Sequence, residues 1–315
     1  MALTIGVDIG GTKVLGGVVD GDGRVLATAR RDTPAGDTAL TLDRIVEVIS
    51  ELAAAYPVAA IGVGAAGWID ADRSTVLFAP NLAWRDEPLR DEIMARVKVP
   101  VVVENDANVA AWAEFRFGAA EDADDSMVLF TVGTGIGGGL VLGGSLVRGA
   151  HGMAGELGHM LLVPGGQLCG CGRHGCIEQY ASGSALVRFA QNGATVDPAE
   201  AAVLLEIAGG DIDKITGPMV TQAARAGDPV SLRAFEQVGY WLGHGLADLV
   251  QIFDPQVLVV GGGVIDAGEL LLEPARRSYR DALAHRAQLP IAEVRAARLG
   301  NTAGVVGAAD LARRR

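Results

Sequence analysis

The chain has 315 residues, of which half are hydrophobic and a fifth are charged. That balance is typical of a globular protein and excludes a disordered chain. The length exceeds what a single hydrophobic core usually fills, so we expect two domains. The formal charge of −12 argues against a nucleic-acid partner, because basic residues cluster only in short runs, as at 276–277 and 313–315.

The sequence shows no targeting or membrane-spanning pattern. No basic flank precedes an apolar stretch near the N-terminus, and no run of about 18 to 20 apolar residues occurs. We therefore expect a cytoplasmic protein with no membrane contact, in which thiols stay reduced.

Two similar runs of elements follow each other along the chain. The first run opens with a strand, a glycine turn and a second strand, and it closes with an all-apolar strand and a helix. Its predicted elements are strands over 3–8, 13–19 and 24–33, a helix over 38–55, strands over 59–63 and 99–104, and a helix over 107–117.

The second run begins at Ser126 with the same strand, glycine turn and strand. The repetition predicts an internal duplication, namely two related α/β domains with a cleft between them, and the chain would cross over at 117–125. The predicted elements are strands over 127–132 and 138–149, helices between 178 and 252, a strand over 257–264, a helix over 268–285, a strand over 293–299 and a helix over 302–314.

The glycine turns are candidate phosphate sites, because backbone N–H groups without a neighbouring Cβ can surround an anion. The segment DIGGTK, residues 8–13, is not a Walker loop, since Thr12 stands where a lysine is required and a strand follows. The G-x-G-x-x-G stretches at 62–67 and 133–138 also precede no predicted helix, so they are weak evidence for dinucleotide binding.

Ordinary hairpin corners therefore compete with corners that hold a nucleotide. The turns at Gly10 and Gly11, at 133–135 and at 261–264 together favour the nucleotide. Asp8, at a strand end, could position Mg²⁺ through water, and Thr12 and Thr134 could add hydroxyl groups.

The segment VENDAN, residues 103–108, lies between a predicted buried strand and a helix, where α/β sheets bind ligands. A kinase that acts on an alcohol needs a carboxylate to accept the hydroxyl proton. Asp106 fits that role, and Asn105 could bind sugar hydroxyls. The competing interpretation is a helix N-cap, and the motif taken alone favours the cap.

All three cysteines, Cys169, Cys171 and Cys176, fall within eight positions, and His159 precedes them. In a reduced compartment this density indicates a metal before a disulfide. Three thiolates and one imidazole complete a tetrahedral zinc site with no open position, so the metal would be structural. A redox pair or three unrelated thiols are alternatives, which an odd count in one glycine-rich loop disfavours.

The same loop could form one wall of a binding pocket. A metal-bound His159 has one ring nitrogen fixed and presents the other to a second partner. Glu156 and Glu178 flank the ligands in sequence, so the three side chains would offer a rigid set of partners for sugar hydroxyls.

Five segments resemble, in order, the ROK family of sugar kinases and sugar-responsive repressors: DIGGTK, ENDAN, TVGTGIGGG, GELGHM and CGCGRHGCIEQYAS. The resemblance covers essentially the whole chain and is strongest toward bacterial ATP-dependent glucokinases. It implies an actin-like, ribonuclease-H-like ATPase fold, with a small domain over 1–118 that recovers the final helix 301–315 and a large domain over 119–300. It also implies a homodimer or homotetramer.

The resemblance further implies phosphorylation of glucose at its 6-hydroxyl, with ATP, Mg²⁺ and a structural Zn²⁺. Asp106 would be the general base. The implied sugar contacts are Gly67, Asn81, Asn105, Asp106, Glu156, His159 and Glu178; the implied nucleotide positions are Gly10, Gly11, Thr12, Lys13, Thr134, Gly262 and Gly263; and the implied zinc ligands are His159, Cys169, Cys171 and Cys176. Asp8, Gly133 and Gly135 join the predicted nucleotide and magnesium site through their place at the strand end and in the second glycine turn.

Rival functions stay open at this point. The acceptor could be N-acetylmannosamine, fructose or allose, and the donor could be polyphosphate. A sugar-sensing regulator without catalysis is an alternative of another class, against which the short segment before DIGGTK and the acidic charge argue. A nicotinamide dehydrogenase built on the glycine motifs is a third alternative.

Overall fold

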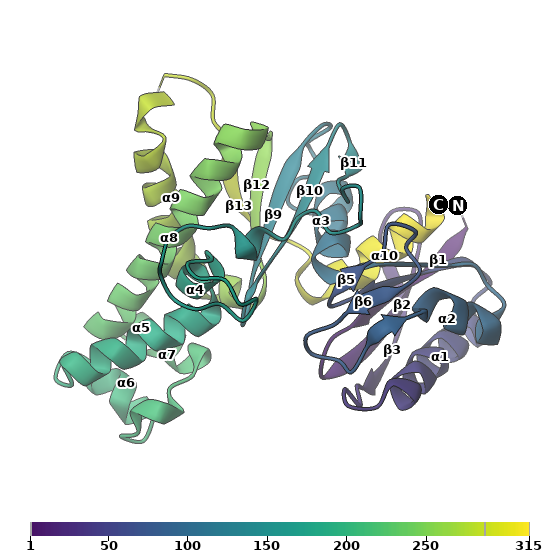
Figure 1. Ribbon diagram of the computed structural model, residues 1–315, viewed down its shortest axis with the longest axis horizontal. Helices are drawn as coiled ribbons and strands as arrows, with labels where there is room; N and C mark the ends of the chain where they lie inside the picture. Colours follow the sequence, from purple (N-terminus) through teal and green to yellow (C-terminus); the bar gives the residue numbers. More distant parts are fainter. Residues whose placement is uncertain (1, 287, 315) are drawn as a thin grey trace. The chain divides into compact units, whose positions relative to one another are not determined.

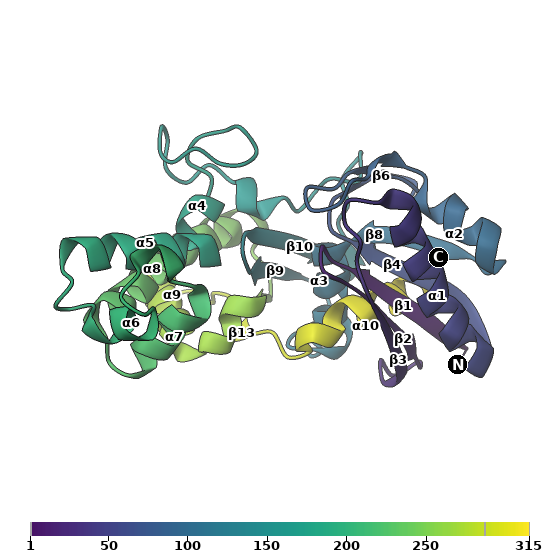
Figure 2. The same cartoon turned by 90° about the horizontal axis from the view of Figure 1, so that it is seen from below.

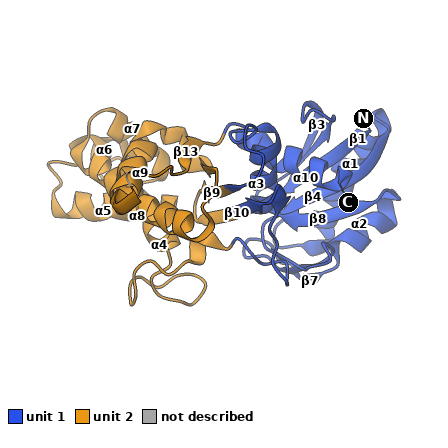
Figure 3. Cartoon of the chain, turned by 90° about the horizontal axis from the view of Figure 1, so that it is seen from above, with its two compact units in different colours: residues 1–127, 139–155, 298–315 blue, residues 128–138, 156–297 orange. Residues whose placement is uncertain are grey.

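The computed structural model describes residues 2–286 and 288–314. The chain divides into two compact units, shown in Figure 3. Unit 1 comprises residues 1–127, 139–155 and 298–315, and unit 2 comprises residues 128–138 and 156–297. These units are defined by compactness, and the domain boundaries expected from the sequence remain a prediction.

The first sheet is mixed and has five strands (Figure 1). In spatial order they are β3 (Val25–Asp32), β2 (Lys13–Val19), β1 (Leu3–Ile9), β4 (Val58–Ala65) and β8 (Val101–Asn105). Strands β1, β2 and β3 pair antiparallel as consecutive hairpins, whereas β1, β4 and β8 are parallel. The carboxyl ends of the three parallel strands therefore meet at one edge of the sheet.

Helices cover both faces of this sheet. Neighbouring residues of a strand point to opposite faces. A Cβ added to Gly16 of β2 would clash with α1 (Thr38–Ala55), and a Cβ added to Gly17 would clash with α10 (Ala303–Arg313). The helix from the start of the chain and the helix from its end thus enclose the same sheet.

Helix α10 approaches the sheet backbone closely. A Cβ at Gly6 of β1 or at Gly62 of β4 would overlap carbonyl groups of α10, so glycine is required at both positions. The opposite side of α10 packs on α3 (Asp106–Phe117), which follows β8. The segment VENDAN therefore lies on a rigid strand-to-helix connection.

The second sheet repeats this topology. In spatial order it contains β11 (Ser145–Leu146), β10 (Ile136–Leu142), β9 (Met127–Val132), β12 (Val257–Gly261) and β13 (Glu293–Ala296). Three consecutive strands are again followed by two later strands, and β12 and β13 are parallel as β4 and β8 are. The internal duplication predicted from the two glycine turns is confirmed.

The helices of unit 2 gather around α8, as Figure 2 shows. Helices α4, α5, α7 and α9 all contact α8, which agrees with the helices predicted between 178 and 252. The bounds are α4 (Glu178–Ala181), α5 (Gly183–Val196), α6 (Ala202–Ile207), α7 (Gly217–Arg225), α8 (Pro229–Phe253) and α9 (Glu269–Ala282).

Several predicted bounds were wrong. The strand predicted over 138–149 is a hairpin of β10 and β11, because Gly143 and Gly144 have φ of +57° and +65° and turn the chain. The strand predicted over 257–264 ends at Gly261, since Gly262 has a φ of +85°. The helix predicted over 268–285 ends at Ala282, and the strand predicted over 293–299 ends at Ala296.

Other elements had no counterpart in the prediction. A three-stranded sheet follows β4 along the chain, and helix α2 follows that sheet. The additional elements are β5 (Trp68–Ile69), β6 (Val76–Phe78), β7 (Arg85–Glu87), α2 (Leu89–Val97) and the 3₁₀ helices Leu157–His159, Ile212–Lys214, Gly263–Ala267, Ala284–Arg286 and Gly300–Thr302.

Within residues 2–286 and 288–314, no helix combines the length and the apolarity needed to cross a bilayer.

Candidate active site

The parallel strands of unit 1 bring two predicted site segments to one edge. Ile9 at the end of β1 pairs with Ala65 of β4, and Ala65 pairs with Asn105 at the end of β8. Asp8 and Asp106 therefore both lie at the carboxyl edge of the sheet, where open α/β sheets bind ligands.

Asn105, and not Asp106, caps helix α3. The Asn105 side chain accepts a hydrogen bond of 3.0 Å from the Asn108 N–H, and its backbone is extended as in other N-caps. Helix α3 starts at Asp106, one residue before the predicted start. The Asp106 carboxylate accepts the Ala107 N–H at 2.9 Å. The cap and the candidate base are thus two different side chains, which the sequence could not separate.

The two aspartates influence each other. Burial raises the pKa of the Asp106 carboxyl above its ordinary value. Burial, followed by the charge of Asp106, raises the pKa of Asp8 to about 6, while the charge of Lys13 acts in the opposite direction. Two partly buried carboxylates that repel each other suit a site that receives a proton and a hard cation.

Further predicted residues surround this edge. The Asn105 amide donates to the Gly67 carbonyl at 3.0 Å, so these two predicted sugar contacts are in direct contact. Gly67 has a φ of +148°, and a Cβ there would overlap the backbone of the small sheet. A Cβ on Gly11 would lie 3.3 Å from the Cβ of Asn81. Asn81 and the first glycine turn are therefore neighbours.

The first glycine turn is a tight hairpin corner. The Gly10 N–H donates to the Lys13 carbonyl at 3.0 Å, and the Thr33 hydroxyl donates to the Gly10 carbonyl at 2.9 Å. The Thr33 N–H donates to the Thr12 carbonyl at 3.1 Å. The corner at residues 10–13 thus has a fixed backbone, which a phosphate nest requires.

The second glycine turn lies in unit 2 against the start of α5. The Gly183 N–H donates to the Gly133 carbonyl at 2.7 Å, and the Ser184 hydroxyl donates to the Thr134 carbonyl at 2.7 Å. The turn itself closes with a 3.0 Å bond from the Gly133 N–H to the Gly135 carbonyl. A helix N-terminus beside a glycine turn favours a bound anion.

A cavity of about 1140 Å³ opens beside this turn, within unit 2. It has room for a nucleoside and its phosphates. Gly262 has a positive φ and directly precedes Gly263, which lines the cavity. Of the predicted nucleotide residues Gly133, Thr134 and Gly263 line the cavity, as does Val264 of the turn at 261–264. The remaining lining residues, which we did not predict, are Gly183, Ser184, Leu186, Val187, Arg188, Gln191, Ile215, Thr216, Gly217, Pro218, Thr221, Gln222, Arg225, Asp266 and Ala267.

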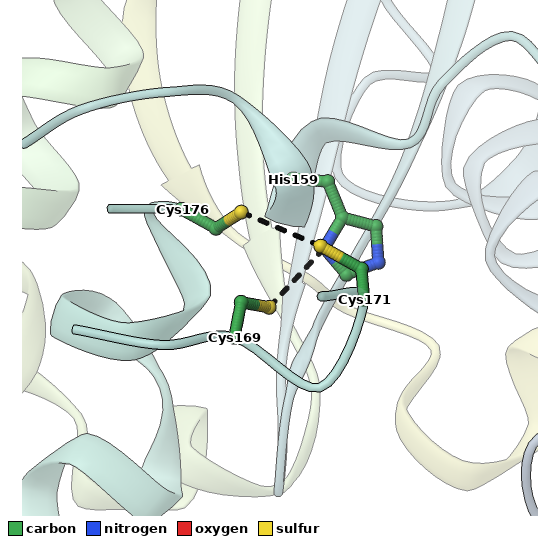
Figure 4. Close-up of side chains that lie close together, drawn as sticks. All are labelled: His159, Cys169, Cys171 and Cys176. Atoms are coloured by element: carbon green, nitrogen blue, oxygen red, sulfur yellow. Dashed lines mark hydrogen bonds between the residues drawn. The ribbon is translucent and has the colours of Figure 1, made fainter. Parts of the chain in front are cut away.

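The three cysteines and His159 converge on one point (Figure 4). Their four candidate ligand atoms lie within 4.8 Å of one another. The Cys171 and Cys176 sulfurs are 3.7 Å apart, and the Cys169 sulfur is 3.7 Å from His159 Nδ1. Zinc–ligand bonds of about 2.3 Å to sulfur and 2.0 Å to nitrogen give a sulfur–sulfur edge of about 3.8 Å and a sulfur–nitrogen edge of about 3.5 Å in a tetrahedron. The donor set and its spacing therefore fit a zinc ion.

The thiols are strongly affected by their surroundings. Burial raises the pKa of Cys176 to about 12 and also raises the pKa of Cys169. The Arg173 N–H lowers the pKa of Cys171. The three thiols lie close together and form no disulfide bond. Such a cluster is suited to binding a metal cation, because the cation displaces the thiol protons that two of these groups otherwise keep.

Glu178 connects the cysteine cluster to the second glycine turn. One carboxylate oxygen accepts from the Cys169 thiol at 3.5 Å, and the other accepts the Ile136 N–H at 3.0 Å. Glu156 lies 4.0 Å from Nε2 of His159, whereas Nδ1 of that ring faces Cys169. His159 thus turns one nitrogen toward the candidate ligands and the other toward Glu156.

The predicted site residues fall into two groups, one in each unit. Unit 1 holds Asp8, the first glycine turn, Gly67, Asn81, Asn105 and Asp106, and unit 2 holds the second glycine turn, Glu156, Glu178, Gly262, Gly263 and the candidate zinc ligands. Each group is assembled within its own unit by the contacts described above.

Duplicated five-stranded sheets, each opened by a glycine hairpin, define the class: the chain has the actin-like, ribonuclease-H-like ATPase fold. The family model described as "ROK family" matches residues 4–315, and the chain belongs to that family. The fold class and the family expected from the sequence are thereby confirmed.

Similar proteins extend over nearly the full chain. A glucokinase of Streptomyces coelicolor is 50% identical over 313 residues, which are 99% of this chain and 98% of that protein. The crystal structure of a ROK family glucokinase from Streptomyces griseus, in complex with glucose and AMPPNP, matches with a TM-score of 0.89 and 52% identity, covering 99% of this chain and 100% of that one. A ROK hexokinase from Thermus thermophilus matches with a TM-score of 0.84 and 37% identity, covering 99% and 98%.

Proposed function

We propose that this protein is a glucokinase, which transfers the γ-phosphoryl group of ATP to the 6-hydroxyl of glucose. The observation that carries the proposal is the Asp106 carboxylate, which lies at the carboxyl edge of the first sheet and has a raised pKa. Because Asn105 caps helix α3, Asp106 is not needed as the cap. The likeness to a glucokinase that binds glucose and AMPPNP supports this substrate pair.

Asp106 takes the role of general base. The 6-hydroxyl oxygen of glucose attacks the γ-phosphorus, its proton passes to the Asp106 carboxylate, and the bond from the γ-phosphorus to the bridging oxygen breaks to release ADP. The raised pKa of Asp106 favours this transfer, because a more basic carboxylate holds the proton better at neutral pH.

Hydrogen-bonding side chains orient the sugar. In unit 1, Asn105 is fixed by its bonds to Asn108 and Gly67, so its orientation is set before glucose binds. In unit 2, Glu156, His159 and Glu178 provide carboxylate and imidazole partners for further hydroxyl groups. Such a set of fixed partners selects among hexoses by the stereochemistry of the hydroxyl groups.

The cavity of unit 2 receives the nucleotide. Gly133, Thr134 and Gly263 face the phosphates, and the apolar residues of α5 and α7 in the lining contact the adenosine. Asp8 would hold Mg²⁺, which would offset the negative charge of the transferred phosphoryl group. The raised pKa of Asp8 would fall once a cation is present.

His159, Cys169, Cys171 and Cys176 would hold a structural zinc ion, which would tie together the loop that carries them. The chain's own contribution is to orient His159, whose second ring nitrogen stays available to Glu156 and the sugar.

We further propose that the protein is cytoplasmic and forms a homodimer or homotetramer. Light scattering of the purified protein would test the oligomeric state.

A panel of sugars with ATP tests the proposed activity. We expect kcat/KM to be highest for glucose, with ADP released in equal amount to sugar phosphate. A higher kcat/KM for N-acetylmannosamine, fructose or allose would identify that sugar as the acceptor in place of glucose. A higher kcat/KM with polyphosphate would identify polyphosphate as the donor in place of ATP. Sugar binding without any ADP release would identify a sugar-sensing regulator.

The zinc proposal predicts the result of replacing one ligand. Cys176→Ser should abolish stoichiometric zinc and lower the melting temperature by roughly 10 °C, because Cys176 is fully buried and the loop has few core side chains. Metal analysis by mass spectrometry and thermal unfolding measure the two effects. His174→Asn, at an exposed histidine of the same loop, should keep the zinc.

The nucleotide proposal predicts the effect of obstructing the cavity. A Cβ built on Gly263 meets no described atom within 4 Å, so Gly263→Val should fold normally while narrowing the cavity. We expect the KM for ATP to rise about tenfold, equivalent to the loss of about 1.4 kcal/mol of binding, with the KM for glucose unchanged.

Steady-state kinetics with each substrate varied in turn will check this prediction. Gly36→Val is the matched control, because Gly36 also has open space at its Cβ and lies outside the cavity. An equal rise in the ATP KM of both variants would contradict the placement of the nucleotide.

A further inference from the structure

Glu104 is a buried carboxylate whose role the proposed reaction leaves unexplained. It precedes Asn105 and Asp106 directly, at the end of β8, and only 1% of its surface is exposed. Carboxylates are rarely buried to this extent unless they are paired with charges and hydrogen-bond donors.

The two carboxylate oxygens of Glu104 serve different partners. One oxygen accepts the backbone N–H of Asn105 and the side-chain amide of Asn108, both at 3.0 Å. The other oxygen lies 2.7 Å from Nε of Arg148 and 3.1 Å from Nε of Arg73. A single side chain thus connects the residues that begin α3 to two arginines from distant parts of unit 1.

Both arginines are themselves fixed by the hairpin that follows β5. The Arg148 guanidinium donates to the carbonyls of Asp70 and Ala71, at 2.8 and 2.7 Å. The Arg73 carbonyl accepts the Val103 N–H at 3.1 Å, and Arg73 has a φ of +56°, which non-glycine residues seldom adopt. The group forms one connected network around the end of β8.

Stability alone does not account for this network. Burying an ion such as Glu104 costs several kcal/mol, as does the partial burial of Arg148, and well-packed apolar residues often stabilise a core at least as well. What apolar residues could not supply is an acceptor for the Asn105 N–H and a fixed direction for the peptide that leads into Asp106.

We propose that Glu104 is a positioning residue for phosphoryl transfer: it orients Asn105 and Asp106 through the Asn105 N–H and the Asn108 amide, and Arg148 and Arg73 hold it in place. This inference rests on the proposed function, because it assigns Asn105 to the sugar and Asp106 to the proton. A displacement of about 1 Å at such groups can lower kcat by about 100-fold.

Glu104→Gln tests the proposal, because an amide of the same shape has one acceptor oxygen and cannot serve both sets of donors. The positive charges of the two arginines attract that oxygen more strongly than the neutral amides do, so the Asn105 N–H would lose its acceptor. We expect kcat to fall about tenfold or more while the KM for ATP stays within about twofold. Amide hydrogen exchange, measured without ligands, should accelerate in the peptide covering residues 104–109.

Asp310→Asn is the matched control. Asp310 is also a buried carboxylate, 2% exposed, that binds arginines and Trp112; its partners in α3, Trp112 and Arg116, follow the VENDAN segment and do not belong to it. The Asp310→Asn variant should lose about as much stability as Glu104→Gln does, while its kcat stays within about twofold of the wild-type value. If Glu104→Gln does not fold, Arg148→Lys replaces it: the lysine keeps the charge beside Glu104 but loses the fork to Asp70 and Ala71, and a kcat loss of about threefold or more is expected.

Two results would overturn the proposal: an unchanged kcat in a folded Glu104 or Arg148 variant, or an equal kcat loss in Asp310→Asn. If the wild-type protein releases no ADP with glucose, the proposed function fails, and hydrogen exchange still decides whether Glu104 orders the start of α3. Unchanged exchange at 104–109 in Glu104→Gln would then reject the positioning role independently.

Discussion

Asp106→Asn should lower kcat at least 100-fold while glucose still binds with a dissociation constant within several-fold of the wild type. Removal of a general base typically slows proton transfer by 10²- to 10⁴-fold. The amide keeps the shape of the side chain and can still accept the Ala107 N–H, so the local backbone is preserved. Single-turnover kinetics with radiolabelled ATP and a glucose-binding titration measure the two quantities separately.

The structure makes this a clean substitution, because Asn105 supplies the N-cap of α3. Loss of a cap would have cost about 1 kcal/mol and confused the result. Burial also raises the pKa of Asp106, so its charged form destabilises the fold at neutral pH, and the amide should leave the melting temperature equal or higher.

Asp91→Asn is the matched control for Asp106→Asn. Asp91 also lies in the first turn of a helix of unit 1, but its side chain is exposed, and kcat should not change. More than about a tenth of the wild-type kcat in Asp106→Asn would show that another group accepts the proton.

The sequence predicted the parts of the site that residue type alone determines. Three cysteines and one histidine in a short loop have few uses in a reduced compartment, so their convergence follows from residue type and spacing. The paired hairpins could be expected too, because alternating apolar strands around glycine turns leave few other arrangements.

The assignment of Asn105 and Asp106 could not be made from the sequence, because either residue can cap a helix and the choice depends on backbone angles. The Glu104 network was equally hidden: Arg73 and Arg148 lie 31 and 44 positions from Glu104, and only the fold brings them together. Strands as short as β5 and β7 show no measurable period in sequence.

The cavity of unit 2 has a similar explanation. Its lining comes from the first part of α5, from α7 and from the loop after β12, which are distant in sequence and are brought together only by the fold, in which α5 and α7 pack on each other and on α8. Apolar and small side chains at helical spacing predict a core surface equally well, so Ile215 and Pro218 gave no signal of a ligand.

Asp8→Asn should lower kcat/KM for ATP about 10- to 100-fold and yet stabilise the ligand-free protein at pH 8. The first effect follows because a group that orients a metal through water usually contributes that much to activity. The second follows because burial and the charge of Asp106 raise the pKa of Asp8 to about 6, so ionised Asp8 destabilises the native state.

The sign of the pH dependence can be derived from linkage. Between pH 3.8 and about 6 the native state binds more protons at Asp8 than the unfolded state does, so stability falls as pH rises through this range. The shift corresponds to at most about 3 kcal/mol. The advantage of Asp8→Asn should therefore be absent below pH 4, grow up to about pH 6 and stay constant above it.

Urea unfolding of metal-free protein at pH 4, 5, 6 and 8 measures this difference, with Asp22→Asn as the control. Asp22 is an exposed aspartate in the turn between β2 and β3, and its replacement controls for the removal of a carboxylate from the surface of the same unit. A constant difference for Asp8→Asn would mean that Asp8 is not desolvated, and the argument for a cation beside it would then fail. A stabilised but inactive variant would instead identify Asp8 as a residue kept for function at the expense of stability.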